Sequence, residues 1–429
     1  MSSGRGTPTG IMTRTSHLLS LRSAAWVTPS RRQLTPRCAR LVALACTFSS
    51  PASLITKAAF DAAKVAAVQQ KYDQRLPIEA FLQLGGLLGA ARAGANPPIL
   101  DVRAPCEFAK GHIPGAINVP LFDDEERATV GTLYKRHGHD TAVKRGLQFV
   151  DRKGWEELLS NVPALCEGDD VLVYCFRGGM RSGGMAHLLS QAPLNVQLLD
   201  GGYKGFRQWA ISQWESDRRL VVVGGPTGSG KTEVLETMRD DLSLQILDLE
   251  GDANHRGSIF GGLGRPTQPT NEMYENILAL QWGRFAASEP VYIEDESHAV
   301  GRCGVPPGLW ERMRDDATPV LRLDVPRAAR VEKLVSEYGV YPPGELADCV
   351  RGLVKRLGHD HVNQLCEYLE ETPPRLAEVA EYLLVNYYDD MYKFQATKRP
   401  FVGHTVPCDS GDALDNARRL VAALGEHYP

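Results

Sequence analysis

The sequence has few cysteines, and none of them belongs to a short paired motif. Nine cysteines are spread over 429 residues, and no two of them form a CxxC pair. Zinc ribbons usually contain such pairs, and small disulfide-bonded domains have far more cysteines per residue. We therefore expect neither a zinc ribbon nor a disulfide framework, and we treat the thiols as reduced.

Long apolar runs and a large excess of one charge are also missing. Hydrophobic residues make up 43% of the chain, but none of the runs reaches the roughly 18 apolar residues that span a bilayer. We therefore expect no membrane partner. The formal net charge of -4 argues against a uniformly basic surface, so a nucleic-acid ligand would need local basic patches. The length predicts two or three domains and says nothing of the oligomeric state.

Acidic residues are absent before Asp61, where arginines lie among Ser, Thr, Ala and Leu. This composition is typical of an organellar transit peptide, with a disordered basic tail or an over-long gene model as alternatives. We expect residues 1–56 to be a transit peptide or a disordered extension. If this segment is a transit peptide, we expect the chain in a mitochondrion or plastid. If it is not, we expect the chain in the cytoplasm. Without the seven arginines the net charge is about -11. They are Arg5, Arg14, Arg22, Arg31, Arg32, Arg37 and Arg40.

Short apolar strands alternate with helical patterns, which predicts parallel α/β sheets. A helical pattern covers 181–189 in the first half, and a polar helical stretch at 208–219 leads into the second. After about Arg327 the pattern is mainly helical, and no internal repeat is visible. The strand candidates begin at Ile99 and cover 170–174, 196–199, 220–223, 244–247, 291–293 and 320–323.

A phosphate-binding loop follows the apolar strand at 220–223. The segment 225–232 matches G-x-x-x-x-G-K-[ST] between a strand and a helical pattern, as the motif requires. Backbone N–H groups and a helix amino terminus would bind an anion, and Lys231 would add a mobile charge. The predicted phosphate-binding residues are Gly225, Thr227, Gly228, Ser229, Gly230, Lys231 and Thr232.

A metal ion at this loop would need an oxygen ligand from a neighbouring strand. Thr232 places a hydroxyl at the loop, and the acidic residues at 294–296 follow the apolar strand 291–293. We expect Thr232 and Asp295 to bind Mg²⁺, with Glu294 and Glu296 as the alternatives to Asp295.

A second loop presents Cys175 after the strand 170–174. Arg177 and Arg181 flank this thiol, glycines lie between them, and a helix follows. A thiol in such a cationic setting at a helix amino terminus is expected to have a lowered pKa and to act as a nucleophilic thiolate. The alternative is a buried core cysteine. Cys106, placed in a turn by the sequence, is a candidate resolving thiol or a bystander.

The segments around this loop resemble the rhodanese superfamily. The match consists of Asp101-Val102-Arg103, Glu107-Phe108 and Gly111-His112-Ile113-Pro114-Gly115-Ala116, with Cys175 at the position of the family's persulfide-forming cysteine. The spacing from Cys175 to Arg181 is C-x5-R, as in cysteine phosphatases. Phosphatase activity is therefore an alternative function for this loop. The spacing equally suits a donor that carries both phosphate and a chalcogen.

The order of the two loops makes the resemblance more specific. A rhodanese domain, then Gly201-Gly202-Tyr203-Lys204, then a P-loop is similar to the tRNA 2-selenouridine synthase family, over roughly residues 99–392. The resemblance implies a rhodanese-like domain at 72–217 and a P-loop NTPase-like α/β domain with a helical C-terminal part at 218–429. Further matching stretches are 123–127, 130–132, 255–258, 260–261, 268–269, 294–297 and 387–389.

The family resemblance implies conversion of wobble 2-thiouridine in tRNA to 2-selenouridine with selenophosphate. It also implies an S-geranylated intermediate formed from geranyl diphosphate at the P-loop, with Mg²⁺. Catalytic roles would fall to Cys175, Arg177 and Arg181. Cys175 either carries selenium covalently or activates the donor. The rivals are a rhodanese-type sulfurtransferase fused to an ATP-dependent P-loop domain, and a non-enzymatic scaffold.

Contacts to the ligand and to tRNA are harder to locate from sequence. His255 and Arg256 follow the P-loop segment and are candidates for ligand contact. His359, His361, Tyr387 and Tyr388 are interpreted as structural. The candidate tRNA contacts are Arg351, Lys355 and Arg356 on one helix, or Lys393, Lys398 and Arg399.

Overall fold

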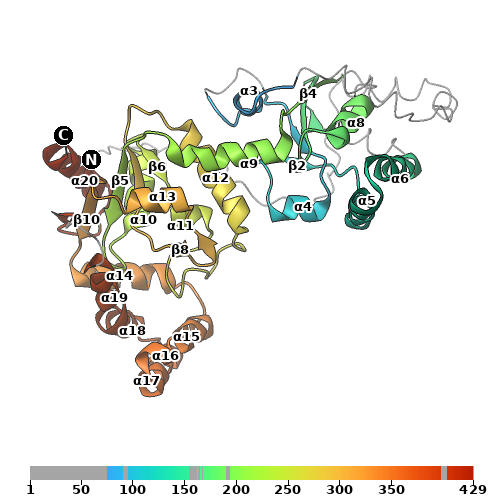
Figure 1. Ribbon diagram of the computed structural model, residues 1–429. Coiled ribbons are helices and arrows are strands. Elements are labelled where there is room, and N and C mark those ends of the chain that lie inside the picture. Colours follow the sequence, from blue (N-terminus) through green and yellow to red (C-terminus); the bar gives the residue numbers. More distant parts are fainter. Residues whose placement is uncertain are drawn as a thin grey trace, which may run out of the picture. The chain divides into compact units, whose positions relative to one another are not determined.

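The computed structural model describes residues 75–89, 95–153, 162, 165–166, 168–189, 194–397 and 403–428 (Figure 1). The chain divides into two units, Met1–Ala59 and Phe60–Pro429, and all described residues belong to the second. The transit-peptide prediction for residues 1–56 lies outside the described residues, as do Lys398 and Arg399. No helix in the described ranges is long and apolar enough to cross a membrane.

The first sheet has four parallel strands in the order β2-β1-β3-β4. The side chains of Val171 to Tyr174, which belong to β3, are inaccessible to solvent. Such burial is expected for a parallel strand that is covered on both faces. The parallel sheet predicted for this half is confirmed. The strands are β1 (Ile99–Asp101), β2 (Ile117–Asn118), β3 (Asp170–Tyr174) and β4 (Asn195–Leu198).

The helices of this half include a hairpin, α5–α6, that the sequence did not predict. Asp123 begins it with a capping box: its carboxylate accepts from the Glu126 N–H at 2.8 Å, and the Glu126 carboxylate accepts from the Asp123 N–H at 3.1 Å. The helices are α3 (Ile78–Leu84), α4 (Pro105–Lys110), α5 (Asp124–His137), α6 (His139–Arg152), α8 (Met180–Leu189) and α9 (Gly202–Ser212).

The helix predicted at 208–219 is shifted toward the amino terminus. It begins at Gly202 and ends at Ser212, and a 3-10 turn, Gln213–Glu215, follows. Aromatic residues on this helix, Tyr203, Phe206 and Trp209, are buried. Burial of this apolar face, rather than the polar pattern after it, decides where the helix lies.

The second sheet has five parallel strands in the order β11-β10-β5-β7-β6. The sequence missed β11, a short strand that pairs with β10 at the edge of the described sheet. An edge strand buries less apolar surface, so its sequence pattern is weaker. The strands are β5 (Leu220–Gly224), β6 (Gln245–Leu247), β7 (Val291–Glu294), β10 (Val320–Asp324) and β11 (His404–Pro407).

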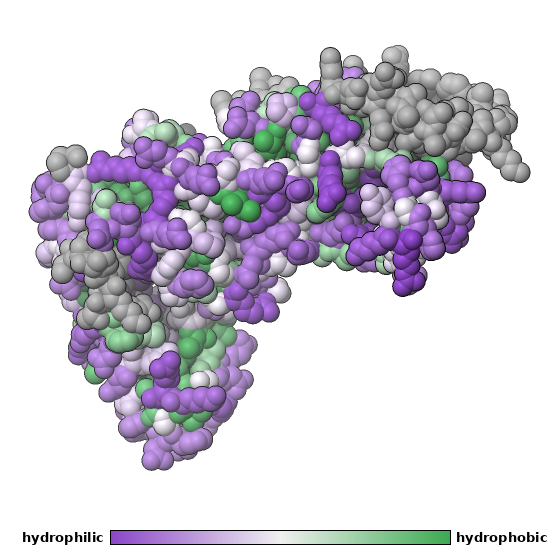
Figure 2. Space-filling model, in the orientation of Figure 1, coloured by the Kyte–Doolittle hydropathy of each residue, from purple (hydrophilic) through white to green (hydrophobic). Residues whose placement is uncertain are grey.

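The helices around and after this sheet confirm the predicted helical C-terminal part. In Figure 2 the visible face is mostly hydrophilic, and hydrophobic atoms gather over the C-terminal helices. The helices are α10 (Lys231–Asp240), α11 (Leu249–Asp252), α12 (Asn271–Arg284), α13 (Pro307–Met313), α14 (Arg327–Tyr338), α15 (Pro343–Arg351), α16 (Val354–Leu357), α17 (His359–Glu370), α18 (Leu376–Leu383), a π-helical turn (Leu384–Tyr388), α19 (Asp389–Thr397) and α20 (Ala413–His427). A two-stranded antiparallel pair, β8 (Ala299–Val300) and β9 (Cys303–Gly304), completes the described elements.

Candidate functional site

The P-loop connects the central strand β5 to helix α10. Gly230 is the N-cap of α10 with φ +77°, a left-handed conformation that glycine adopts without a Cβ clash. Except for Ser229, every residue predicted to bind phosphate lines one cavity. The Ser229 side chain is buried, and its N–H donates to the Pro226 carbonyl at 3.1 Å. Phosphate binding by these residues stays a prediction.

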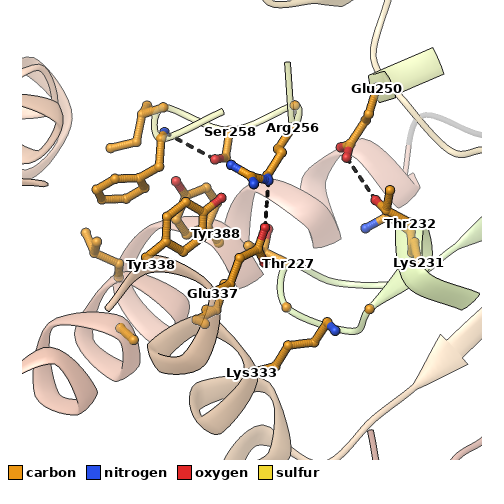
Figure 3. A pocket seen from close by; sticks show the side chains of 18 of the residues that line it. Thr227, Lys231, Thr232, Glu250, Arg256, Ser258, Lys333, Glu337, Tyr338 and Tyr388 are labelled. Carbon is orange, nitrogen blue, oxygen red and sulfur yellow. Dashed lines mark hydrogen bonds and ion pairs between the residues drawn. The ribbon is translucent and has the colours of Figure 1, made fainter. Parts of the chain in front are cut away.

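Two side chains of the motif, Lys231 and Thr232, make hydrogen bonds near the loop. Lys231 Nζ donates to the Gly225 carbonyl at 3.0 Å. Thr232 Oγ1 donates to Glu250 Oε2 at 2.9 Å (Figure 3). Glu250 lies on α11, and the sequence did not single it out. Its pKa is raised because burial penalises the charged carboxylate, although nearby Lys231 acts in the opposite direction.

The three acidic residues after β7 occupy different environments. Glu294 is fully buried, accepts from the Leu249 N–H at 2.9 Å, and has a pKa raised by burial and by Asp248. Asp295 lines the cavity and forms an ion pair with Arg314 at 3.2 Å. Burial and the Glu250 carboxylate raise the pKa of Glu296, also at the cavity, to about 8.

The described residues contain no group of three or more His, Cys, Asp or Glu side chains placed to hold a metal ion. A hydroxyl and carboxylates do lie at the P-loop, and these are the oxygen ligands that Mg²⁺ prefers. Because Mg²⁺ is commonly held by one or two protein oxygens together with phosphate oxygens of a ligand, this arrangement fits such an ion. The assignment of Thr232 and Asp295 as its ligands stays a prediction.

The cavity at the P-loop has a volume of about 1000 Å³ and two chemically different ends. The charged end is formed by Lys231, Thr232 and Glu250, seen on one side of Figure 3. Tyr338 and Tyr388 lie on the other side of that view. Beyond them the lining is aliphatic and comes from the C-terminal helices. The residues that form this apolar end are Leu346, Leu369, Leu376, Val379 and Leu383.

Helix α14 holds the P-loop from the C-terminal side, which the sequence did not predict. Arg330 is 5% exposed, donates to the Thr227 carbonyl at 3.1 Å, and makes two hydrogen bonds of 2.8 Å with the Asp389 carboxylate. Lys333, also on α14, forms an ion pair with Glu233 of α10. The helical region therefore contributes both to the cavity wall and to the position of the loop.

His255 and Arg256 both line the cavity, where the sequence predicted a ligand contact. Arg256 forms an ion pair with Glu337 of α14 at 2.8 Å (Figure 3). It also donates to the Leu263 carbonyl at 3.1 Å. Burial lowers the pKa of His255, and its Nδ1 is buried without a hydrogen-bond partner in the described part of the chain. Their contact with a ligand stays a prediction.

Cys175 lies directly after β3, and its side chain is only 3% exposed. Its Sγ is 3.2 Å from Ser182 Oγ, and Ser182 donates to the Gly179 carbonyl at 3.0 Å. The start of α9 makes two backbone hydrogen bonds to the loop. The Tyr203 N–H donates to the Cys175 carbonyl at 2.8 Å, and the Lys204 N–H donates to the Phe176 carbonyl at 2.9 Å. The Gly201-Gly202-Tyr203-Lys204 segment, at the start of α9, therefore has a structural role in shaping the cysteine loop.

The two arginines of the loop differ in their partners. Arg181 forms an ion pair with Glu107 at 2.6 Å, and Arg127 of α5 also contacts Glu107, at 3.4 Å. The Arg181 charge is thus balanced by a carboxylate. Arg177 is exposed and makes no ion pair within the described ranges. Of the two, Arg177 is the better placed to meet an incoming anion.

Several sequence interpretations of peripheral residues need correction. Cys106 lies in helix α4 rather than in a turn, and a hydrogen bond with Asp124 together with burial raises its pKa. Arg351 ends α15, whereas Lys355 and Arg356 lie on α16, so these three candidate tRNA contacts are not on one helix. Arg351 also pairs with Asp348 at 2.6 Å, which reduces its availability to phosphate.

Comparisons with known proteins agree with this architecture. A rhodanese-like domain model matches residues 87–208, and a tRNA 2-selenouridine synthase AAA domain model matches residues 218–345. The chain is 37% identical over 270 residues to the tRNA 2-selenouridine synthase of Nitrosomonas europaea, covering 61% of this chain and 69% of that protein. The order of a rhodanese-like domain and a P-loop domain is confirmed, while the boundaries 72–217 and 218–429 stay a prediction.

Two further relatives of the same name match over more of their length. The one from Hydrogenovibrio crunogenus is 35% identical over 338 residues, which cover 71% of this chain and 90% of the relative. The one from Pseudomonas savastanoi pv. phaseolicola is 36% identical over 358 residues, which cover 75% and 94%.

Proposed function

Because the chain belongs to the tRNA 2-selenouridine synthase family, we propose that it converts wobble 2-thiouridine in tRNA to 2-selenouridine. Selenophosphate is the selenium donor, and an S-geranylated tRNA made from geranyl diphosphate is the intermediate. The P-loop cavity carries out the alkylation, and the cysteine loop carries out the exchange of sulfur for selenium.

The cavity with one charged and one apolar end is the observation that supports this proposal. A diphosphate matches the P-loop end, where backbone N–H groups, the α10 amino terminus and Lys231 provide positive potential. A geranyl chain has no hydrogen-bonding groups, so the aliphatic end formed by Leu346, Leu369 and Leu383 suits it fully. A base and ribose in the same place would bury polar groups beside hydrocarbon, which costs free energy.

In the alkylation, the sulfur of 2-thiouridine attacks C1 of the geranyl group. The S–C1 bond forms, the C1–O bond breaks, the diphosphate leaves with the electron pair, and N3 of the base loses its proton to water. Lys231 stabilises the charge that develops on this leaving group. Mg²⁺ bound by Thr232 and Asp295 would supply further positive charge there. Nucleotide hydrolysis is not required.

In the exchange, alkylation has converted the sulfur into a leaving group. Selenium of the donor attacks C2 of the base, the C2–Se bond forms, the C2–S bond breaks, and geranylthiolate leaves with the electron pair and takes a proton from water. Water then cleaves the Se–P bond, phosphate is released, and N3 of the base regains a proton from water. Arg177 holds the anionic donor near the loop, and Cys175 positions the donor, because a bond between the Cys175 sulfur and selenide-level selenium would need a two-electron oxidant.

The test is to incubate the protein with tRNA carrying 2-thiouridine, geranyl diphosphate and selenophosphate, and to analyse the nucleosides by mass spectrometry. We expect 2-selenouridine from the wild type. Lys231→Ala should form neither product, because it loses charge at the leaving diphosphate, and Cys175→Ser should accumulate the S-geranyl nucleoside. Absence of both products with the wild type would refute the proposal. ATP turnover that requires Lys231 and ignores geranyl diphosphate would favour an ATP-dependent P-loop domain.

We further propose that residues 1–56 direct the chain to an organelle, because they combine seven arginines with no acidic residue. A fusion of these residues to a fluorescent protein should enter mitochondria or plastids. Diffuse cytoplasmic fluorescence of that fusion would contradict targeting.

A further inference from the structure

A second cavity, of about 670 Å³, lies in the rhodanese-like domain between the cysteine loop and the α5–α6 hairpin. Cys175 and Met180 line it from the loop side. The hairpin and the segment before it supply a largely apolar wall, of which Phe122 and Val150 are buried. The apolar residues of this wall are Leu121, Phe122, Val130, Val143, Leu147 and Val150.

The donor anion alone gives no physical reason for such a wall. A small, doubly charged anion is stabilised by N–H groups and arginines, and hydrocarbon beside it only removes water from its charge. Volumes between about 300 and 1,000 Å³ are typical of sites that enclose an organic ligand. The cavity is therefore suited to a bulky apolar group that must lie close to Cys175.

Two of the charged side chains around this cavity are paired with a carboxylate. Arg127 and Arg181 also line it, but both contact Glu107, so a carboxylate balances them. Arg177 and Lys135 are exposed at its edge. An apolar wall together with exposed cations is complementary to a hydrocarbon chain attached to a polyanion.

We propose that this cavity binds the hydrocarbon chain on the sulfur of an S-alkylated 2-thiouridine in tRNA, while the modified base faces the cysteine loop. The proposal rests on the proposed function, and adds a subsite that selects the alkylated intermediate in the second step. Unalkylated 2-thiouridine has nothing to place in the cavity. The chain departs from it as the alkylthiol once the C2–S bond has broken.

The test compares two substrates in the exchange step, with the full chain and selenophosphate. Anticodon stem-loops carry either S-geranyl-2-thiouridine or S-methyl-2-thiouridine, and kcat/KM for 2-selenouridine formation is measured for each. Because the longer chain buries far more apolar surface, the wild type should prefer the geranyl substrate by about tenfold or more.

Leu147 and Val143 lie one helical turn apart on α6, and both line the cavity. Leu147→Trp fills it, so the preference for the geranyl substrate should fall about tenfold. Val143→Phe is a smaller change that tests the same wall if the tryptophan variant does not fold. Lys144→Trp is the matched control, because Lys144 is exposed on the same helix and does not line the cavity. It should keep the wild-type preference.

Several outcomes would overturn the inference. Equal rates on both substrates with the wild type, or an unchanged preference in folded Leu147→Trp and Val143→Phe, would show that the cavity does not bind the chain. If the wild type geranylates 2-thiouridine from geranyl diphosphate but shows no chain preference, this inference alone fails. If it forms no geranylated product and converts neither alkylated substrate, the proposed function fails with it.

Discussion

Asp101 and Arg103 of the rhodanese-like signature have a structural role that the sequence did not predict. Arg103 and Asp101 form an ion pair of 2.6 Å that is almost completely buried, and Arg103 also donates to the Gly111 carbonyl at 2.7 Å. The guanidinium lies 3.8 Å from the centre of the Tyr203 ring. Such a pair is costly to break, because the remaining charge would stay buried. This signature therefore orders the segment around the cysteine loop.

Asp252, at the end of α11, makes stability depend on pH. Burial and the Asp248 carboxylate raise its pKa from 3.8 to about 7, and it accepts from Gln281 Nε2 at 2.7 Å. A carboxyl group whose pKa is higher in the folded protein binds a proton on folding. The contribution of the Asp252 carboxyl group to the free energy of unfolding is therefore complete below about pH 4. It is lost as the pH rises through 7.

Asp252→Asn should remove this dependence, because a neutral amide can still accept from Gln281. We expect the variant and the wild type to melt at similar temperatures at pH 4. At pH 8.5 the variant should be more stable, by roughly 1–3 kcal/mol after allowance for solvent. Thermal unfolding at both pH values measures this. Asp240→Asn is the control, because Asp240 is exposed and its pKa is lowered by Arg239. A variant that melts below the wild type at pH 8.5 would contradict the assignment.

At the scale of elements, both functional loops depend on segments that are not part of them. The cysteine loop lies on the start of α9, and the P-loop is held by α14 through Arg330. Gly202 lies where the start of α9 contacts the cysteine loop, and its φ is +57°. A Cβ at this position would lie 2.4 Å from the Cys175 carbonyl oxygen. Backbone at that distance cannot give way as a flexible side chain can.

Gly202→Ala should therefore displace the cysteine loop and slow the exchange step by about tenfold or more. Geranylation at the P-loop should continue near the wild-type rate, since that cavity is lined by residues from 225 onward. Nucleoside mass spectrometry with S-geranyl tRNA and with 2-thiouridine tRNA separates the two steps. Gly168→Ala is the control, because a Cβ there meets no atom within 4 Å. An exchange rate equal to that of the control would disprove the supporting role of Gly202.

At the scale of the whole chain, each cavity is built from its own stretch of sequence. Residues between 121 and 188 line the cavity at Cys175, and residues between 225 and 411 line the cavity at the P-loop. No lining residue is shared. Each chemical step should therefore be supported by a chain in which the other site is inactive.

A mixture of Lys231→Ala and Cys175→Ser chains should consequently restore formation of 2-selenouridine from 2-thiouridine tRNA. The tRNA would be alkylated by one chain, dissociate, and be selenated by the other. We expect a rate within about tenfold of the wild type, because release and rebinding add a bimolecular step. Each variant alone is the control. A mixture that accumulates only S-geranyl tRNA would show that the intermediate does not pass between chains.

The sequence alone determined the two loops, their order and the parallel α/β character of both halves. A P-loop consists of consecutive residues, so strand, glycines, lysine and helix are all visible in the segment 220–240. The loop from Cys175 to Arg181 is equally local. Short edge elements such as β11, and the hairpin α5–α6, were missed because their patterns are weak without knowledge of what they pack against.

Only the tertiary structure decided what surrounds these loops. Glu250 contacts Thr232 across 18 positions of sequence, and Glu107 contacts Arg181 across 74. Leu383 lines the P-loop cavity although it lies more than 100 positions after the loop. No local pattern encodes such a distance, because it follows from how helices pack on the sheets. The anion-binding ends of both sites were readable from sequence, whereas their apolar ends exist only once separate helices are brought together.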